Sequence, residues 1–365
     1  MSSADFEIAF ADGGKTRVFI GPLAELPALC GEVGLKGTPG LICDSRLLDL
    51  HRPALRELES LGPPIARTVL ETKKSLAEVD TMCEALAARG VGRDGFVVAL
   101  GGGVLTDLAG LAAALYLRGV PWVSAPTTLL AQVDAGLGGK TGANLRAGKN
   151  LVGAFHQPRL VVCDPALLAT LPVRERWSGL AEIVKCALIA PAQDAGGEPF
   201  LDRCERDLEK AASGDLDALA PLIEASVRIK ARIVAADERE GGQRAFLNFG
   251  HTVGHALEAA TQYARFTHGE AVALGLRGAL FLSHARGLLP PQDAARALAL
   301  VLRLRVEPDR RLESDQLTAT MEAMARDKKA LAGQVRFVLL EGLGKPKLHQ
   351  VEPALCAQAI AASLS

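Results

Sequence analysis

Three of the chain's seven histidines lie close together, at positions 251, 255 and 268. His251 and His255 are four residues apart, so a helix would present both imidazoles on one face. Imidazole is a common ligand of transition metals, and it also transfers protons near neutral pH. The spacing therefore predicts a metal or catalytic site with His251 and His255 as the candidate ligand pair. The alternative is that these histidines are structural.

A carboxylate that could serve as third ligand is Glu182, in the segment Ala181-Glu182-Ile183-Val184-Lys185. Catalytic metal sites often combine imidazoles with one carboxylate. The alternative is a helical ion pair with Lys185, three residues further on. Spacing alone leaves both interpretations open.

A second motif is the glycine run Gly101-Gly102-Gly103, which follows an apolar segment and leads to Asp107. Glycine lets backbone amides approach a phosphate closely, and the N-terminus of a following helix adds positive partial charge. The run predicts a pyrophosphate site, although a tight turn would also explain it. Asp44 ends an earlier predicted strand, where a carboxylate either binds a ribose or adenine edge or is an ordinary loop residue.

A third region, residues 126–144 and 148–150, is rich in glycines, hydroxyls and amides, and it carries Lys140 and Lys149. Backbone amides and ammonium groups are the donors that a phosphorylated ligand needs. The region therefore predicts a binding surface for such a ligand. The alternative is a pair of flexible surface loops.

Two kinds of element must position these motifs. In the first half, short β-branched runs predict buried strands at 17–20, 40–43, 96–100 and 122–125, and apolar spacing predicts a helix over 75–89. Strands that alternate with helices indicate an α/β domain with a parallel, Rossmann-like sheet. We expect this domain to span residues 1–177.

After residue 178 the composition changes to long segments rich in Ala, Leu, Glu and Arg. These segments predict an all-α domain over 178–365. Its expected helices are 179–188, 216–237, 252–263, 270–286 and 292–304.

The overall composition excludes several classes of protein. Lys and Arg total 41 against 42 for Asp and Glu, so the basic excess of a nucleic-acid binder is missing. The first residues lack the basic and apolar parts of a signal peptide, and the most apolar stretch contains Asp107 and Arg118, so no membrane span is expected. Seven scattered cysteines fit reduced thiols, which indicates a cytoplasmic protein.

Longer blocks follow one another in a fixed order along residues 44–344. They are Gly101-Gly102-Gly103-Val104 with Asp107; Arg118-Gly119-Val120; residues 126–150; Ser178-Gly179-Leu180-Ala181-Glu182 with Lys185; Asp237-Glu238-Arg239-Glu240; Arg244 with Leu247-Asn248; Gly250-His251-Thr252 with Gly254-His255-Ala256; and His268-Gly269-Glu270-Ala271-Val272. In these blocks the sequence resembles the 3-dehydroquinate synthases, which are sugar phosphate cyclases.

The resemblance implies an active site in a cleft between a nucleotide-binding domain and a helical metal-binding domain. It replaces the ligand pair that spacing suggests, because the family's metal ligands, for zinc or cobalt, match Glu182, His251 and His268. His255 would then face the substrate and help to manage a proton or to bind an oxyanion.

The resemblance also assigns residues to the two organic ligands. NAD contacts would come from Asp44, Glu71, Lys74, Gly102, Gly103, Val104, Asp107, Thr127, Thr128, Asp134, Lys140, Lys149 and Thr170. Substrate contacts would come from Arg118, Asp134, Lys140, Asn150, Lys185, Lys230, Arg244, Asn248, His255 and Lys328. Among these, the catalytic group would be Lys185, Lys230, Arg244, Asn248 and His255, and Arg118 would reach the partner's site in a homodimer.

The implied substrate is a sugar-acid phosphate, 3-deoxy-D-arabino-heptulosonate 7-phosphate. Transient oxidation by NAD, phosphate elimination, reduction, ring opening and an intramolecular aldol closure would give 3-dehydroquinate, a step of the shikimate pathway. The alternatives are an amino-dehydroquinate synthase or other cyclase, a metal-dependent alcohol or glycerol dehydrogenase, and a scaffold that only binds NAD. Leu70 and Thr106 stand where the family usually has glycine beside the nucleotide, and Ala135-Gly136 replaces a common Ser-Ser pair.

Overall fold

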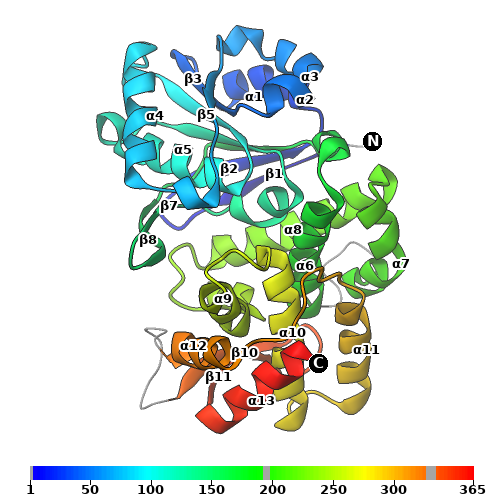
Figure 1. Cartoon of the computed structure of the whole chain (residues 1–365). Coiled ribbons are helices and arrows are strands. Elements are labelled where there is room, and N and C mark those ends of the chain that lie inside the picture. Colours follow the sequence, from blue (N-terminus) through cyan, green and yellow to red (C-terminus); the bar gives the residue numbers. More distant parts are fainter. Residues whose placement is uncertain (1–2, 192–197, 326–333) are drawn as a thin grey trace. The chain divides into compact units, whose positions relative to one another are not determined.

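The computed structural model describes residues 3–191, 198–325 and 334–365 (Figure 1). The chain divides into two compact units, Met1–Leu171 with Lys230–Arg239, and Pro172–Ile229 with Glu240–Ser365. The division thus falls slightly before the expected position between residues 177 and 178. The last residues of the long helix α8 (Leu216–Ala236) belong to the first unit.

Among the described residues, the first unit is built on a seven-stranded sheet of order β1-β2-β9-β6-β5-β3-β4. Only the edge pair of β1 and β2 is antiparallel, and the other neighbours run parallel, which confirms the predicted parallel α/β sheet. The strands are β1 (Ala4–Ala9), β2 (Lys15–Ile20), β3 (Pro39–Asp44), β4 (Ile65–Arg67), β5 (Phe96–Gly101), β6 (Trp122–Pro126) and β9 (Leu160–Cys163).

Helices cover both faces of this sheet, so its central strands alternate between two cores. In β5, Val98 and Leu100 pack into one cluster, whereas Val97 and Ala99 pack into the other. The first cluster includes residues of α1 (Leu26–Glu32), and the second includes residues of α4 (Leu76–Ala88) and α5 (Gly103–Leu115). Shorter elements of this unit are α2 (Leu47–Leu50), α3 (Arg52–Arg56), η1 (Leu23–Glu25), η2 (Glu59–Leu61), η3 (Glu71–Lys73), η4 (Tyr116–Arg118) and η6 (Pro165–Thr170).

The glycine-rich region after β6 is more ordered than the loop interpretation predicts. One turn of π-helix, η5 (Ala131–Ala135), is followed by an antiparallel hairpin of β7 (Lys140–Leu145) and β8 (Gly148–Phe155). The hairpin contacts α5, where a Cβ on Gly110 would lie 2.5 Å from Cγ2 of Thr141. The glycine therefore permits the close approach that fixes the hairpin.

The second unit is mainly helical, as expected, but it also contains a small hairpin of β10 (Val335–Leu340) and β11 (Pro346–Val351) (Figure 1). The hairpin, α10 (His268–Ala285) and α13 (Pro353–Leu364) share one apolar core that includes Leu274, Phe337 and Ile360. The elements are α6 (Val173–Ile189), α7 (Phe200–Ser213), most of α8, η7 (Gln243–Asn248), α9 (His251–Ala260), α10 (His268–Ala285), α11 (Pro291–Leu302), α12 (Ser314–Ala325) and α13 (Pro353–Leu364).

Within the described ranges, no helix has both the length and the apolar character needed to cross a bilayer. All seven cysteines are free thiols, and Cys83 is the one that is only partly buried.

Candidate active site

Three helices of the second unit bring one carboxylate and two imidazoles together. Glu182 comes from α6, His251 is the first residue of α9, and His268 is the first residue of α10. Oε1 of Glu182 lies 3.3 Å from Nε2 of His251 and 3.4 Å from Nε2 of His268. The three side chains thus offer a compact set of ligand atoms from distant parts of the sequence.

The donor set and its spacing fit a tetrahedral divalent metal. Ligand bonds of about 2.0–2.1 Å at a tetrahedral angle separate the ligand atoms by about 3.3 Å. Oε1 of Glu182 is buried and has no hydrogen-bond partner among the described residues, although both Nε2 atoms face it. Such an orphaned buried oxygen is costly in a folded protein, and a cation would satisfy it.

Each of the three ligand residues also has an outer partner. Nδ1 of His251 donates to the Phe249 carbonyl at 3.2 Å, and Nδ1 of His268 donates to Glu258 at 3.3 Å. Lys185 donates to the second oxygen of Glu182, so the predicted ion pair exists and still leaves Oε1 facing the imidazoles. Outer partners of this kind orient metal ligands and direct Nε2 of each histidine toward the cation.

Positive groups around Glu182 hold it as a carboxylate. Burial disfavours the charged form of Glu182, but Lys185 and His251 outweigh it and hold the pKa of this carboxyl well below its usual range. Burial also lowers the pKa of His268, whereas its contacts with the carboxylates of Glu182 and Glu258 raise it, to about 10 in the balance.

Close backbone contacts explain how the three helices converge. The amide of Gly269 donates to Oγ of Ser178 at 3.0 Å, and a Cβ at Gly269 would lie 2.1 Å from the Ser178 carbonyl oxygen. Thr267 and Glu270 form a capping box that fixes the start of α10. As a result, α10 begins next to α6 with His268 at its first turn.

His255 lies beside the cluster rather than in it. Its ring centroid is 5.1 Å from that of His251 and 5.9 Å from that of His268, and its side chain is exposed. It forms a second group of potential ligands with Glu258 and His268. The group of potential ligands that contains His251 thus includes His268 and not His255, because the segment between α9 and α10 returns the chain to His251.

Other predicted residues of the second unit lie on η7. Arg244 is almost fully buried, and Nδ2 of Asn248 donates to Glu240 at 2.9 Å. Glu240 adopts a left-handed backbone conformation with φ of 59°, which is unusual for this residue type. No role is predicted for Glu240 from the sequence, although it stands at the end of the block 237–240.

In the first unit, the glycine run lies at the carboxyl end of β5 and continues into α5. The amide of Thr127 donates to the Gly101 carbonyl at 2.9 Å, so the ends of β5 and β6 meet there. A Cβ on Gly102 would lie 3.2 Å from Thr128. Gly103 and Val104 form the first turn of α5, as a pyrophosphate site requires.

A buried ion pair lies close to this turn. Nζ of Lys74 donates to Asp107 at 2.5 Å and to Oδ1 of Asn150 at 2.6 Å. Burial raises the pKa of Asp107 to about 6 although Lys74 opposes this shift. Oε1 of Glu71 lies 3.7 Å from Nζ of Lys149. With Lys74, Asp107 and Asn150, this makes five predicted ligand-binding residues in one region.

The remaining predicted residues are more dispersed. Asp44 is buried and paired with Arg46, and the hydroxyl of Thr170 hydrogen-bonds with His51 at 2.7 Å. Lys230 donates to the Asp134 carboxylate and to its carbonyl.

Three predicted cationic residues complete the set. Lys140 begins β7 and Arg118 ends η4, and both are exposed. Lys328 lies outside the described residues.

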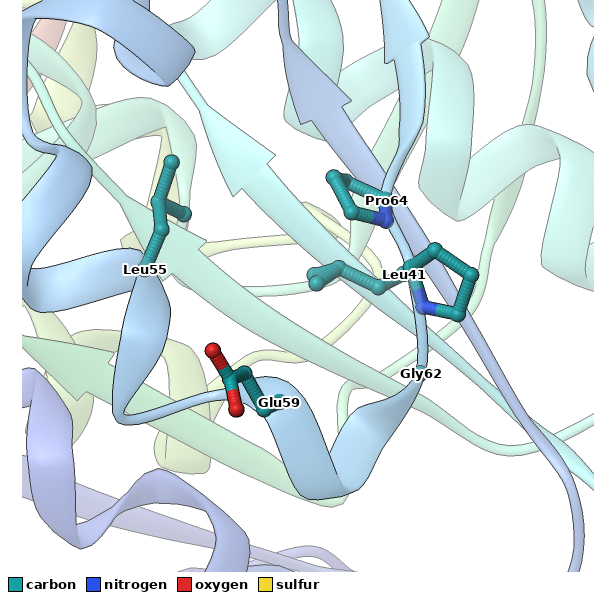
Figure 2. Close-up of a pocket in the computed structure, with 6 residues that line it drawn as sticks. Leu41, Leu55, Glu59, Gly62 and Pro64 are labelled. Atoms are coloured by element: carbon teal, nitrogen blue, oxygen red, sulfur yellow. The ribbon is translucent and has the colours of Figure 1, made fainter.

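A cavity of about 280 Å³ lies elsewhere in the first unit (Figure 2). Its walls are mainly apolar, and among the described residues that line it Glu59 alone is ionisable. None of the predicted site residues lines it, so we assign this cavity no part in the chemistry. The lining residues are Leu41, Leu55, Glu59, Gly62, Pro63 and Pro64.

Solved structures with the same architecture define the class. A 2-deoxy-scyllo-inosose synthase complexed with carbaglucose-6-phosphate, NAD⁺ and Co²⁺ aligns with a TM-score of 0.87 at 29% identity, over 98% of this chain and 99% of the other. A 2-epi-5-epi-valiolone synthase from Streptomyces hygroscopicus with NAD⁺ and Zn²⁺ bound gives 0.82 and 29%, over 100% and 99%. An iron-containing alcohol dehydrogenase from Thermotoga maritima, at 17% identity and a TM-score of 0.65 over 100% and 99%, shares the fold alone. The chain therefore has the fold of the sugar phosphate cyclases.

The sequence matches narrow the class further. Residues 65–178 match the model for the 3-dehydroquinate synthase N-terminal part, and residues 179–330 match the C-terminal part. The chain is 42% identical to the 3-dehydroquinate synthase of Citrifermentans bemidjiense over 91% of this chain and 90% of that one. It is 45% identical to the enzyme of Salinibacter ruber over 92% and 90%. The chain belongs to the 3-dehydroquinate synthase family, whose members are carbon–oxygen lyases.

Proposed function

We propose that the chain converts 3-deoxy-D-arabino-heptulosonate 7-phosphate to 3-dehydroquinate and phosphate, with NAD and one zinc or cobalt ion as cofactors. The observation that carries this proposal is the convergence of Glu182, His251 and His268, with Lys185 and His255 beside them. A tertiary cluster of this kind supports metal-assisted chemistry on a substrate hydroxyl. The family membership supports the choice of substrate.

Glu182, His251 and His268 would hold the metal, and Glu258, Lys185 and the Phe249 carbonyl would orient them. When bound, the metal lowers the pKa of a coordinated substrate hydroxyl, and NAD accepts and later returns a hydride. His255 is exposed on the same helix face as His251, so its imidazole would exchange a proton with the substrate.

The first unit would hold NAD at the start of α5. Gly102, Gly103 and Val104 offer backbone amides, and Thr127 and Thr128 offer hydroxyls at the end of β6. The other proposed NAD contacts are Asp44, Glu71, Lys74, Asp107, Asp134, Lys140, Lys149 and Thr170. We propose two functional domains, of which residues 1–177 bind NAD and residues 178–365 bind the metal and the substrate.

The predicted cationic residues would bind the anionic groups of the substrate. Lys185 and Arg244 in the second unit are buried, which favours strong charge–charge contacts with a desolvated anion. In the first unit, Lys230, Asp134, Lys140 and Asn150 would position the substrate, and Arg118 would act across a homodimer. Leu115 and Leu117 beside Arg118 are exposed hydrophobic residues, which supports an interface at this position.

Seven free thiols support a cytoplasmic location.

The test is to incubate the purified protein with the heptulosonate phosphate, catalytic NAD and zinc. We expect equimolar phosphate and cyclic product without net NADH, because the hydride returns to the same carbon. Stoichiometric NADH would instead indicate a dehydrogenase, and turnover of an amino-substituted substrate alone would indicate another cyclase.

A further inference from the structure

Asn144, on β7, connects two segments of the first unit that are far apart in the sequence. Its Nδ2 donates to Oε1 of Glu71 at 2.8 Å, and its backbone amide donates to the Lys74 carbonyl at 2.8 Å. Its Oδ1 accepts the backbone amide of Asn150 at 2.9 Å. One residue therefore ties the turn at residues 71–74 to the start of β8.

The residue at the far end of this connection is held in an uncommon conformation. Asn150 has a φ of 52°, a left-handed geometry that asparagine adopts more easily than most residues but that still needs support. The hydrogen bond to Asn144 fixes its backbone, and the hydrogen bond from Lys74 at 2.6 Å fixes its side chain. The direction of the Asn150 side chain thus depends on both contacts.

Lys74 completes a hydrogen-bond network whose other members are Glu71, Asp107, Asn144 and Asn150. Its Nζ contacts both Asp107 and Asn150 and is only 4% exposed as a side chain. Glu71, Lys74 and Asp107 are proposed to bind NAD, and Asn150 is proposed to bind the substrate. Asn144 belongs to neither group, yet it touches Glu71, Lys74 and Asn150.

We propose that Asn144 is a positioning residue that couples NAD binding to substrate binding. NAD contacts at Glu71 and Lys74 would order the network and so preset Asn150 for the substrate, and the reverse coupling follows because linkage is reciprocal. The ligand that binds second finds the network already ordered. This inference rests on the proposed function, because that function supplies the roles of the neighbouring residues.

The test measures affinities by calorimetry on the full-length, zinc-loaded protein. The probes are NAD and a carbocyclic phosphonate analogue of the heptulosonate phosphate, which cannot lose phosphate. In the unchanged protein we expect each ligand to raise the affinity for the other ligand at least about fivefold. In Asn144→Ala this factor should fall to about twofold or less.

Arg146→Ala is the matched control, because Arg146 is an exposed residue of the same hairpin turn. It should keep the full coupling factor. An Asn144→Ala protein that also keeps it, with both ligands bound, would overturn this inference and leave the proposed function intact. An unchanged protein that fails to bind NAD would overturn both.

Asn144→Asp provides a second variant of nearly the same shape, in case the alanine variant folds poorly. Its carboxylate still accepts the Asn150 amide, but it repels the Glu71 carboxylate that Nδ2 had bound. We expect weaker NAD binding, with the affinity for the analogue alone within about twofold of normal. Unchanged NAD affinity in this variant would contradict the proposed connection.

Discussion

At the residue scale, the metal candidates are held by partners that differ in charge. His251 depends on a neutral carbonyl, whereas His268 depends on the Glu258 carboxylate, which is itself almost fully buried. A carboxylate behind an imidazole raises the basicity of the ligand nitrogen. Glu258 should therefore raise the metal affinity, although it contacts the outer nitrogen of His268 rather than the nitrogen that faces Glu182.

We predict that Glu258→Gln weakens zinc binding about tenfold or more, because glutamine keeps the shape but removes the charge behind His268. The dissociation constant can be measured by chelator competition with the metal-free protein. Glu224→Gln is the control, since Glu224 forms a surface pair with Arg228 on α8. Equal zinc affinity in the Glu258 variant and its control would contradict the assigned role.

The sequence predicted part of this site and not the rest for a physical reason. Spacing of four residues identifies two histidines on one helix face, and His251 and His255 are indeed neighbours on α9. The contact of His251 with His268 depends on the turn between two helices, which no local period encodes. The residue types alone made Glu182 and His268 candidates, but only the resemblance to a family grouped them with His251 in advance.

At the scale of elements, α9 and α10 approach so closely that glycine is required. A Cβ on Gly275 would lie 1.9 Å from the Gly250 carbonyl oxygen, and Gly250 is the N-cap of α9 with a φ of 80°. Because His251 follows Gly250 directly, the same contact that packs the helices also sets the position of a metal candidate.

We predict that Gly275→Ala destabilises the second unit by about 2–4 kcal/mol, since backbone atoms would have to move. It should also weaken zinc binding. Gly31→Ala in α1 is the control, because a Cβ there meets nothing within 4 Å, so its stability should stay equal or rise slightly. Thermal unfolding and zinc titration of both variants measure these effects. A Gly275→Ala protein as stable as its control would show that the helices are not in this contact.

Sequence periodicity predicted strands β2, β3, β5 and β6 and the helices α4, α6 and α8 to α11. It did not predict β1, β4, β9, α7, α12 and α13, nor the hairpins β7–β8 and β10–β11. In β7 and β8, glycines and polar residues hide the period of two that marks a strand. Packing against α5 and the contacts of Asn144 hold the hairpin instead. Such non-local contacts decide structure where intrinsic propensity is weak.

At the scale of the whole molecule, both units bury thiols deeply. Burial raises the pKa of Cys30, Cys43 and Cys163 to about 12. At pH 8 only about one such thiol in 10⁴ is ionised, and the thiolate is the reactive form.

We therefore predict that a thiol-specific reagent at pH 8 modifies the native protein slowly, with the partly exposed Cys83 first. All seven thiols should react at once in denaturant. Counting modified residues by mass spectrometry over time checks this. Rapid modification of Cys30 or Cys163 in the native protein would contradict the buried arrangement.

The claim on which the account depends is that one cation, held by Glu182, His251 and His268, is required for a lyase reaction. The most direct measurement titrates the metal-free protein with zinc while phosphate release from the heptulosonate phosphate is followed. We predict a plateau of activity at one zinc per chain, and neither zinc binding nor turnover in Glu182→Ala. Full phosphate release without zinc, or normal metal content and turnover in Glu182→Ala, would contradict it.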